Sequence, residues 1–220
     1  MDPADEAAAR ALRRGLARDR PSPAEFRAQL LALPPEARDA WIDQLWDIDE
    51  LPEDEPLPRG CVPYLPADVA TVLEALDAAA VTDDDVFVDV GSGLGRVVAL
   101  ARLCTGARGI GVEIQPGLVR AAAERAAALG LDRVRFFGGD AAALTDALAE
   151  GSVFFLYCPF GGDRLARLLD ELHRLAQTRP LRICCVGMPR LRVPWLTPVP
   201  STSVDLTVYR AGDDPTLGPT

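Results

Sequence analysis

The feature that most constrains the fold is a glycine-rich segment, residues 86–96, with the sequence VFVDVGSGLGR. A short apolar run ends near Asp89, and an apolar segment with helical spacing begins after Arg96. Between them stand three alternating glycines, Gly91, Gly93 and Gly95. This layout predicts a buried strand, a tight turn in which the backbone approaches a ligand, and the start of a helix. In open α/β sheets, nucleotide-type cofactors bind at such a turn, so we expect a Rossmann-like α/β domain.

The charge and spacing of this turn indicate which cofactor it binds. Dinucleotide-binding turns follow the pattern Gly-x-Gly-x-x-Gly and hold a pyrophosphate at the helix N-terminus. Here Arg96 stands where the third glycine of that pattern belongs, and the carboxylate of Asp89 precedes the turn. A carboxylate repels a diphosphate and attracts a cation. S-adenosylmethionine carries an ammonium and a sulfonium and no phosphate, so the turn favours it over NAD.

Further predicted strands end in groups suited to the same ligand. Residues 109–113 form a strand ending at Glu113, about 20 residues beyond the glycines, where a carboxylate reaches ribose hydroxyls. After a third strand, 134–138, Asp140 is placed to accept the adenine amino group. A fourth strand covers residues 153–157. The predicted cofactor contacts are Tyr64, Asp89, Gly91, Ser92, Gly93, Gly95, Glu113, Ile114, Asp140, Ala141 and Tyr157.

The sequence from Asp89 to Gly95, together with Glu113 and Asp140, resembles the cofactor motifs of class I S-adenosylmethionine-dependent methyltransferases. The string over residues 87–98 is especially similar to the seven-strand, non-SET histone-lysine methyltransferases and their bacterial relatives. The resemblance covers roughly residues 62–187. It implies a doubly wound, mostly parallel seven-stranded sheet with an antiparallel C-terminal strand. It also implies a methyltransferase with S-adenosylmethionine as its cofactor.

The sequence departs from this family after the fourth strand. Tyr157 and Cys158 replace the acid or amide and the first proline of the Asp/Asn-Pro-Pro-Tyr/Phe motif, and the Asn-containing motif of the histone enzymes is missing. The carbonyl that holds an amine acceptor is therefore absent. Nor do these two residues replace the acidic and amide ligands of metal-dependent catechol-type enzymes. We expect a metal-independent in-line displacement, in which the protein aligns donor and acceptor and excludes water.

By analogy with the family, the acceptor lies above the end of the fourth strand. Tyr157 is the candidate catalytic residue, as a hydrogen-bonding group, and with Pro159 and Phe160 it is expected to contact the acceptor. The alternative is that these residues simply close the end of the sheet. Trp41 is a further candidate, as part of an aromatic-lined acceptor pocket. A place in the hydrophobic core is the alternative for this tryptophan.

The chain divides into three predicted parts. Residues 1–58 form a helical N-terminal extension or lid followed by an acidic linker, 59–212 form the methyltransferase domain, and 213–220 form a tail. In the extension, a capping box that begins at Ser22 predicts a helix start. Before the first strand, Tyr64 is expected to cover the methionine end of the cofactor; the alternative is that it packs the N-terminal helices onto the sheet.

Composition limits the partners and the compartment. A net charge of −10 argues against duplex nucleic acid, whose affinity comes largely from basic side chains. A local basic groove would have Arg182, Arg190 and Arg192 as its candidates, but we favour a solvated surface for these arginines. No apolar run approaches the roughly 18 to 20 residues of a membrane span. The N-terminus lacks an apolar signal core, and the five cysteines show no paired or metal-like spacing, so we expect a cytoplasmic protein. The absence of lysine and asparagine indicates a GC-rich bacterial genome.

These observations favour a small molecule or short peptide as the methyl acceptor. Two alternatives remain open. One is a protein methyltransferase of the lysine type, suggested by the similarity of the glycine-rich segment to the histone enzymes, although the acidic N-terminus lacks the basic extensions of that family. The other is a non-catalytic module that binds the cofactor while its acceptor pocket is filled.

Overall fold

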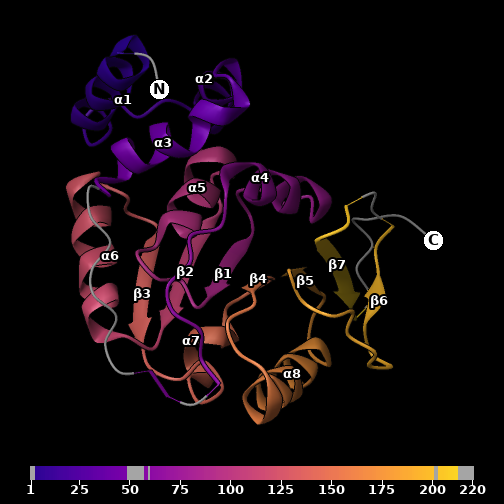
Figure 1. Cartoon of the computed structure of the whole chain (residues 1–220). Helices are drawn as coiled ribbons and strands as arrows, with labels where there is room; N and C mark the ends of the chain where they lie inside the picture. Colours follow the sequence, from indigo (N-terminus) through magenta and orange to yellow (C-terminus); the bar gives the residue numbers. More distant parts are fainter. Residues whose placement is uncertain (1–2, 49–56, 59, 201–202, 213–220) are drawn as a thin grey trace.

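A computed structural model describes residues 3–48, 57–58, 60–200 and 203–212. Within them the chain forms a seven-stranded sheet with the order β3-β2-β1-β4-β5-β7-β6 (Figure 1). The strands are β1 (Val86–Val90), β2 (Arg108–Glu113), β3 (Val134–Gly138), β4 (Val153–Tyr157), β5 (Leu181–Val186), β6 (Thr197–Pro198) and β7 (Leu206–Ala211). Strands β1 to β5 pair in parallel, whereas β7 runs antiparallel to both β5 and β6. The predicted Rossmann-like sheet with an antiparallel C-terminal strand is confirmed.

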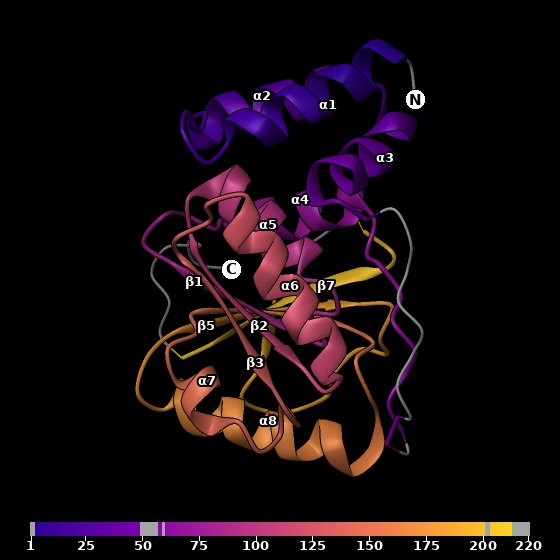
Figure 2. The ribbon, with the colours of Figure 1, turned by 90° about the vertical axis from the view of Figure 1, so that its left-hand side faces the viewer.

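Helices cover both faces of the sheet (Figures 1 and 2). They are α1 (Pro3–Gly15), α2 (Pro23–Ala32), α3 (Pro35–Trp46), α4 (Val69–Ala78), α5 (Arg96–Thr105), α6 (Pro116–Ala128), α7 (Thr145–Ala149) and α8 (Gly162–Ala176). Helices α4, α5 and α6 share one hydrophobic core with the sheet, and α7 and α8 share the other. None of the described helices has the length and apolar character that a membrane crossing requires.

The central strands are buried along their whole length, as expected for parallel strands covered by helices on both faces. Every residue of β1 and β5 is buried, and β4 is buried up to its last residue, Tyr157. Asp89 is buried like the rest of β1, but it carries a carboxylate whereas the other residues of the strand are apolar. Its Cα pairs with Gly111 of β2 on one side and Phe155 of β4 on the other. The fold thus places an acidic side chain in the middle of the sheet, next to the glycine-rich turn.

The N-terminal helices form a further layer, outside α4 and α5 (Figure 1). The predicted capping box is present: the Ser22 hydroxyl accepts the backbone N–H of Glu25, whose carboxylate accepts the N–H of Ser22 in return. Phe26 of α2 and Trp41 of α3 are buried, with ring centroids 5.9 Å apart. The helices therefore share the core of α4 and α5. Much of the acidic linker and the tail, residues 49–56 and 213–220, lie outside the described residues.

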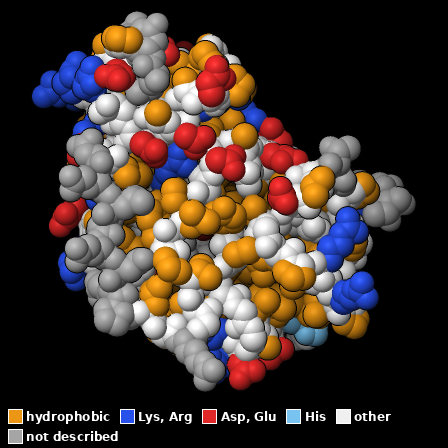
Figure 3. All heavy atoms as spheres, in the orientation of Figure 1, with side chains coloured by type: hydrophobic (Ala, Val, Ile, Leu, Met, Phe, Trp, Pro, Cys, Tyr) orange, Lys and Arg blue, Asp and Glu red, His pale blue; other side chains and the backbone are white. Residues whose placement is uncertain are grey.

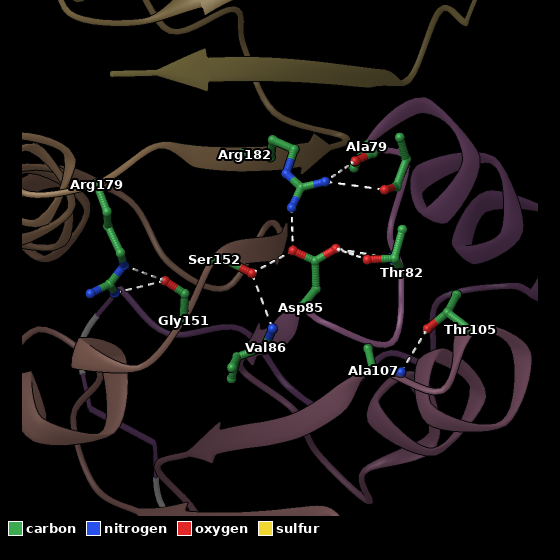
Figure 4. A network of polar contacts seen from close by, with 11 residues as sticks. Ala79, Thr82, Asp85, Val86, Thr105, Ala107, Gly151, Ser152, Arg179 and Arg182 are labelled. Atoms are coloured by element: carbon green, nitrogen blue, oxygen red, sulfur yellow. Dashed lines mark hydrogen bonds and ion pairs between the residues drawn. The ribbon is translucent and has the colours of Figure 1, made fainter. Parts of the chain in front are cut away.

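At the amino ends of the strands a buried polar network joins α4 to the sheet (Figure 4). Asp85, just before β1, accepts hydrogen bonds from the hydroxyl of Ser152 at 2.7 Å and from the backbone N–H of Thr82 at 2.8 Å, and pairs with Arg182 of β5. The Arg182 guanidinium also donates to the carbonyl of Ala79 at 2.7 Å. Arg182 is only 9% exposed. It is therefore a buried structural residue, so neither the basic groove nor the solvated surface considered for it from the sequence is correct.

Candidate functional site

The glycine-rich turn between β1 and α5 takes a backbone path that only glycine follows without strain. Gly91, Gly93 and Gly95 have φ values of +84°, +50° and +78°, in the left-handed region that disfavours side chains. A Cβ atom on Gly93 would lie 2.1 Å from the ring of Tyr64, and one on Gly95 would lie 2.5 Å from the ring of Phe136. The turn is therefore shaped both by its own conformation and by two aromatic rings packed onto it.

Glu113, at the end of β2, holds this turn from the neighbouring strand. One carboxylate oxygen accepts the backbone N–H of Gly93 at 2.9 Å, and the other accepts the N–H of Gln115 at 2.9 Å. Each carboxylate oxygen has a second lone pair. Because Glu113 also lines the adjoining cavity, those lone pairs are available to a pair of ligand hydroxyls.

Asp89 and Ser92 are buried polar groups beside a second, smaller cavity. Burial and, to a lesser extent, the negative charge of Glu113 raise the pKa of Asp89 to about 8. The hydroxyl of Ser92 is buried and has no hydrogen-bond partner among the described residues. Orphaned polar groups in a native interior indicate a missing partner. A cationic ligand end that also donates hydrogen bonds would satisfy both.

The main cavity has a volume of about 500 Å³ and lies between the carboxyl ends of the strands and the residues that precede α4. Figure 3 shows hydrophobic side chains gathered across the middle of this view of the molecule. The predicted site residues that line the cavity are Tyr64, Gly91, Glu113, Ile114, Asp140, Ala141, Tyr157, Pro159 and Phe160.

Four of the predicted cofactor contacts do not line this cavity. Asp89 and Ser92 line the smaller neighbouring one, and Gly93 lies beneath the Tyr64 ring. Gly95 caps the start of α5. The structure likewise does not bring Trp41 to the cavity, because its ring packs against Phe26 in the core, which is the alternative that the sequence left open.

Comparison with known proteins identifies this arrangement. Residues 87–179, from β1 to just before β5, match the sequence model of a family described as a methyltransferase domain. This match and the fold support an S-adenosylmethionine-dependent methyltransferase. No curated protein matches this chain. The comparisons do not extend the similarity of the glycine-rich segment to the histone-lysine enzymes, so that finer resemblance stays a prediction.

Solved structures share the fold. The RNA methyltransferase from Salinibacter ruber, in complex with S-adenosyl-L-homocysteine, is 28% identical, with 70% of this chain and 100% of that chain covered and a TM-score of 0.49. The putative methyltransferase yhhF from Escherichia coli is 15% identical, with coverages of 71% and 91% and a TM-score of 0.51. MtNAS in complex with MTA and tNA is 16% identical, with coverages of 97% and 78% and a TM-score of 0.52.

One wall of the methyltransferase cavity is a segment that precedes α4, residues 61–67, which we call the strap. Cys61 forms an isolated antiparallel bridge with Phe160, so the strap is joined to the loop after β4. Tyr64 lines both cavities, and burial raises its pKa to about 12. Val62 and Leu65 also line the cavity although they are 49% and 65% exposed, which places apolar groups at its mouth.

Sequence reasoning missed Arg164, a cavity residue in the first turn of α8. Its guanidinium lies 2.7 Å from a carboxylate oxygen of Asp140, and the other oxygen of Asp140 accepts the backbone N–H of Ala142 at 3.1 Å. These two contacts fix the orientation of the Asp140 carboxylate and leave one lone pair on each oxygen. The residues next to Arg164 in the sequence do not predict this role, because its partner Asp140 lies 24 positions earlier.

Proposed function

We propose that this methyltransferase moves the methyl group of S-adenosylmethionine to a small molecule or short peptide with a largely apolar body, by in-line displacement and without a metal ion. The observation that carries the proposal is the main, largely apolar cavity, which joins the glycine-rich turn to the strap and to the end of β4. Cavities that enclose small ligands have volumes of roughly 300–1,000 Å³ and mostly apolar walls with a few polar groups.

The residues around the turn fit the cofactor group by group. Glu113 offers two free lone pairs to ribose hydroxyls, and Asp140, held by Arg164, offers one to the adenine amino group. Asp89 and Ser92 together suit an ammonium end, which supplies positive charge to one and hydrogen bonds to the other. The cofactor itself supplies a methyl group activated by a positive sulfur. The acceptor lone pair forms a bond to the methyl carbon as the carbon–sulfur bond breaks and S-adenosylhomocysteine leaves, and the protein contributes alignment and exclusion of water.

The acceptor side is formed by the end of β4 and the strap. Tyr157 contributes a hydroxyl, whereas Pro159 and Phe160 contribute apolar walls. We infer that Tyr157 orients the acceptor by a hydrogen bond while the apolar walls select its body. Among the described residues, no cluster of three metal-ligating side chains stands near this position or elsewhere. We propose that the transfer relies on geometry and on the charge of the donor.

Labelled cofactor tests the proposal. The purified chain is incubated with S-adenosylmethionine carrying a labelled methyl group and with a cell lysate, and macromolecules are then separated from small molecules. We expect the label in the small-molecule and short-peptide fraction. Label in protein bands would instead favour the lysine-type protein methyltransferase, and cofactor binding with no label in either fraction would favour the non-catalytic module. The Gly93→Val variant is the control, because its side chain would collide with Tyr64 in the turn.

A further inference from the structure

The N-terminal helices contact the glycine-rich turn directly. Trp46, the last residue of α3, is 2% exposed, and its indole N–H donates to the backbone carbonyl of Leu94 at 2.7 Å. Leu94 is fully buried and stands between Gly93 and Gly95. A residue 48 positions earlier in the chain thus holds the middle of the turn.

Arg96 makes a second connection, one residue after the turn. Its guanidinium is 4% exposed and lies 2.6 Å from a carboxylate oxygen of Asp39 and 2.7 Å from one of Asp43, both on α3. It also donates to the backbone carbonyl of Ala67, at the end of the strap. The same oxygen of Asp39 accepts the backbone N–H of Val69, the first residue of α4. One arginine therefore joins α3, the strap and α4 to the first turn of α5.

These contacts act on a segment that glycine makes flexible. Three glycines in five residues lose more conformational freedom on ordering than any other residue type would. If the turn were ordered only when the ligand arrived, that loss would subtract from the binding free energy. The bond from Trp46 to Leu94 and the anchored Arg96 hold the turn on both sides of Gly95 through contacts within the chain. Affinity for the cofactor then includes a contribution from α3, which lines neither described cavity.

We infer that α3 is part of the cofactor site, with Trp46 and Arg96 as positioning residues that keep the glycine-rich turn in its binding conformation. The inference rests on the cofactor site of the proposed function. In it, the N-terminal helices are a fixed support for the turn and not the predicted lid. The fold likeness to MtNAS covers 97% of this chain.

The test compares two tryptophans of the same helix in the full-length chain. Trp46→Phe removes the indole N–H that reaches the turn, and Trp41→Phe is the matched control, since Trp41 is also buried in α3 but packs against Phe26. Binding of S-adenosylhomocysteine is measured by calorimetry and unfolding by thermal melting. We expect Trp46→Phe to raise Kd about 5- to 20-fold, as one lost buried hydrogen bond would, and Trp41→Phe to stay within about twofold of wild type at a similar loss of Tm.

Hydrogen exchange gives a second measurement that a merely structural role would not move. In the ligand-free chain, amides of residues 91–95 should exchange faster in Trp46→Phe than in Trp41→Phe. Equal effects of the two variants on Kd and on exchange in the turn would overturn the inference while leaving the proposed function intact. A wild-type chain that takes up no S-adenosylhomocysteine would instead overturn the proposed function, and the inference with it.

Discussion

The buried carboxylate of Asp89 makes cofactor binding depend on pH in a predictable direction. Its pKa is raised to about 8, first by burial and then by the charge of Glu113, so in the empty site it holds a proton at neutral pH. A cation placed beside it favours the ionised form. Binding of S-adenosylmethionine should therefore release one proton, and affinity should rise with pH up to about 8. Each pH unit below that value costs about 1.4 kcal/mol, a factor of ten in Kd.

Calorimetry between about pH 5.5 and pH 7 checks this, because an α-ammonium with a pKa of about 7.7–8.0 stays protonated there. Over that range we expect the Kd of the wild-type chain to fall about 30-fold, or about 2 kcal/mol. Buffers with different ionisation heats should report close to one proton released. Asp89→Asn keeps the size of the side chain and removes the titration, so its profile should be flat and its affinity near pH 7 lower. A flat wild-type profile, or the same slope in both proteins, would refute the reasoning.

Further predictions concern the stability of the empty chain and the two ends of the sheet. Because folded Asp89 keeps a proton that the unfolded chain loses above about pH 4, stability should fall as pH rises from about 4 to about 8; denaturant unfolding of Asp89→Asn should lack that slope. Gly93→Val should abolish cofactor uptake without unfolding the chain, since its side chain would meet Tyr64; near-native calorimetric affinity would contradict this. Glu113→Ala should weaken binding by about 1–3 kcal/mol through unpaired hydroxyls, and an unchanged Kd would remove its assigned role. Asp85→Ala should destabilise the chain by about 3–5 kcal/mol by leaving Arg182 buried without its carboxylate; chemical unfolding measures this, and folded material should keep wild-type affinity.

Local patterns were sufficient to predict the framework of the fold. The strand that ends near Asp89, the turn and the next helix could be predicted because periodicity and glycine spacing are written in consecutive residues. The strand ends at Glu113 and Tyr157 followed from the same kind of pattern, with β2 beginning one residue earlier than expected. Within residues 193–200 the structure has only the strand β6, two residues long. Prolines in this stretch lack the N–H that a strand ladder needs.

What the sequence did not reveal depends on contacts between distant positions. Arg96 was interpreted only as the residue that excludes a dinucleotide pattern, whereas the structure gives it partners on α3 and in the strap. The orientation of Asp140 likewise depends on Arg164, on a helix beyond β4. Trp41 and Trp46 look alike in sequence, five positions apart on one helix. Their different roles depend on tertiary packing, since Trp41 packs against Phe26 and Trp46 donates to the turn.

The network around Asp85 lies at the amino ends of the strands, whereas the cavity lies at their carboxyl ends. A strand of five residues, such as β1, separates the two by roughly 17 Å, and substitutions that far apart usually act additively. The residues that stabilise the fold in the network around Asp85 therefore differ from the residues that line the acceptor cavity. Substitutions that raise thermal stability can be made at the amino ends of the strands, and substitutions that change the acceptor can be made at their carboxyl ends.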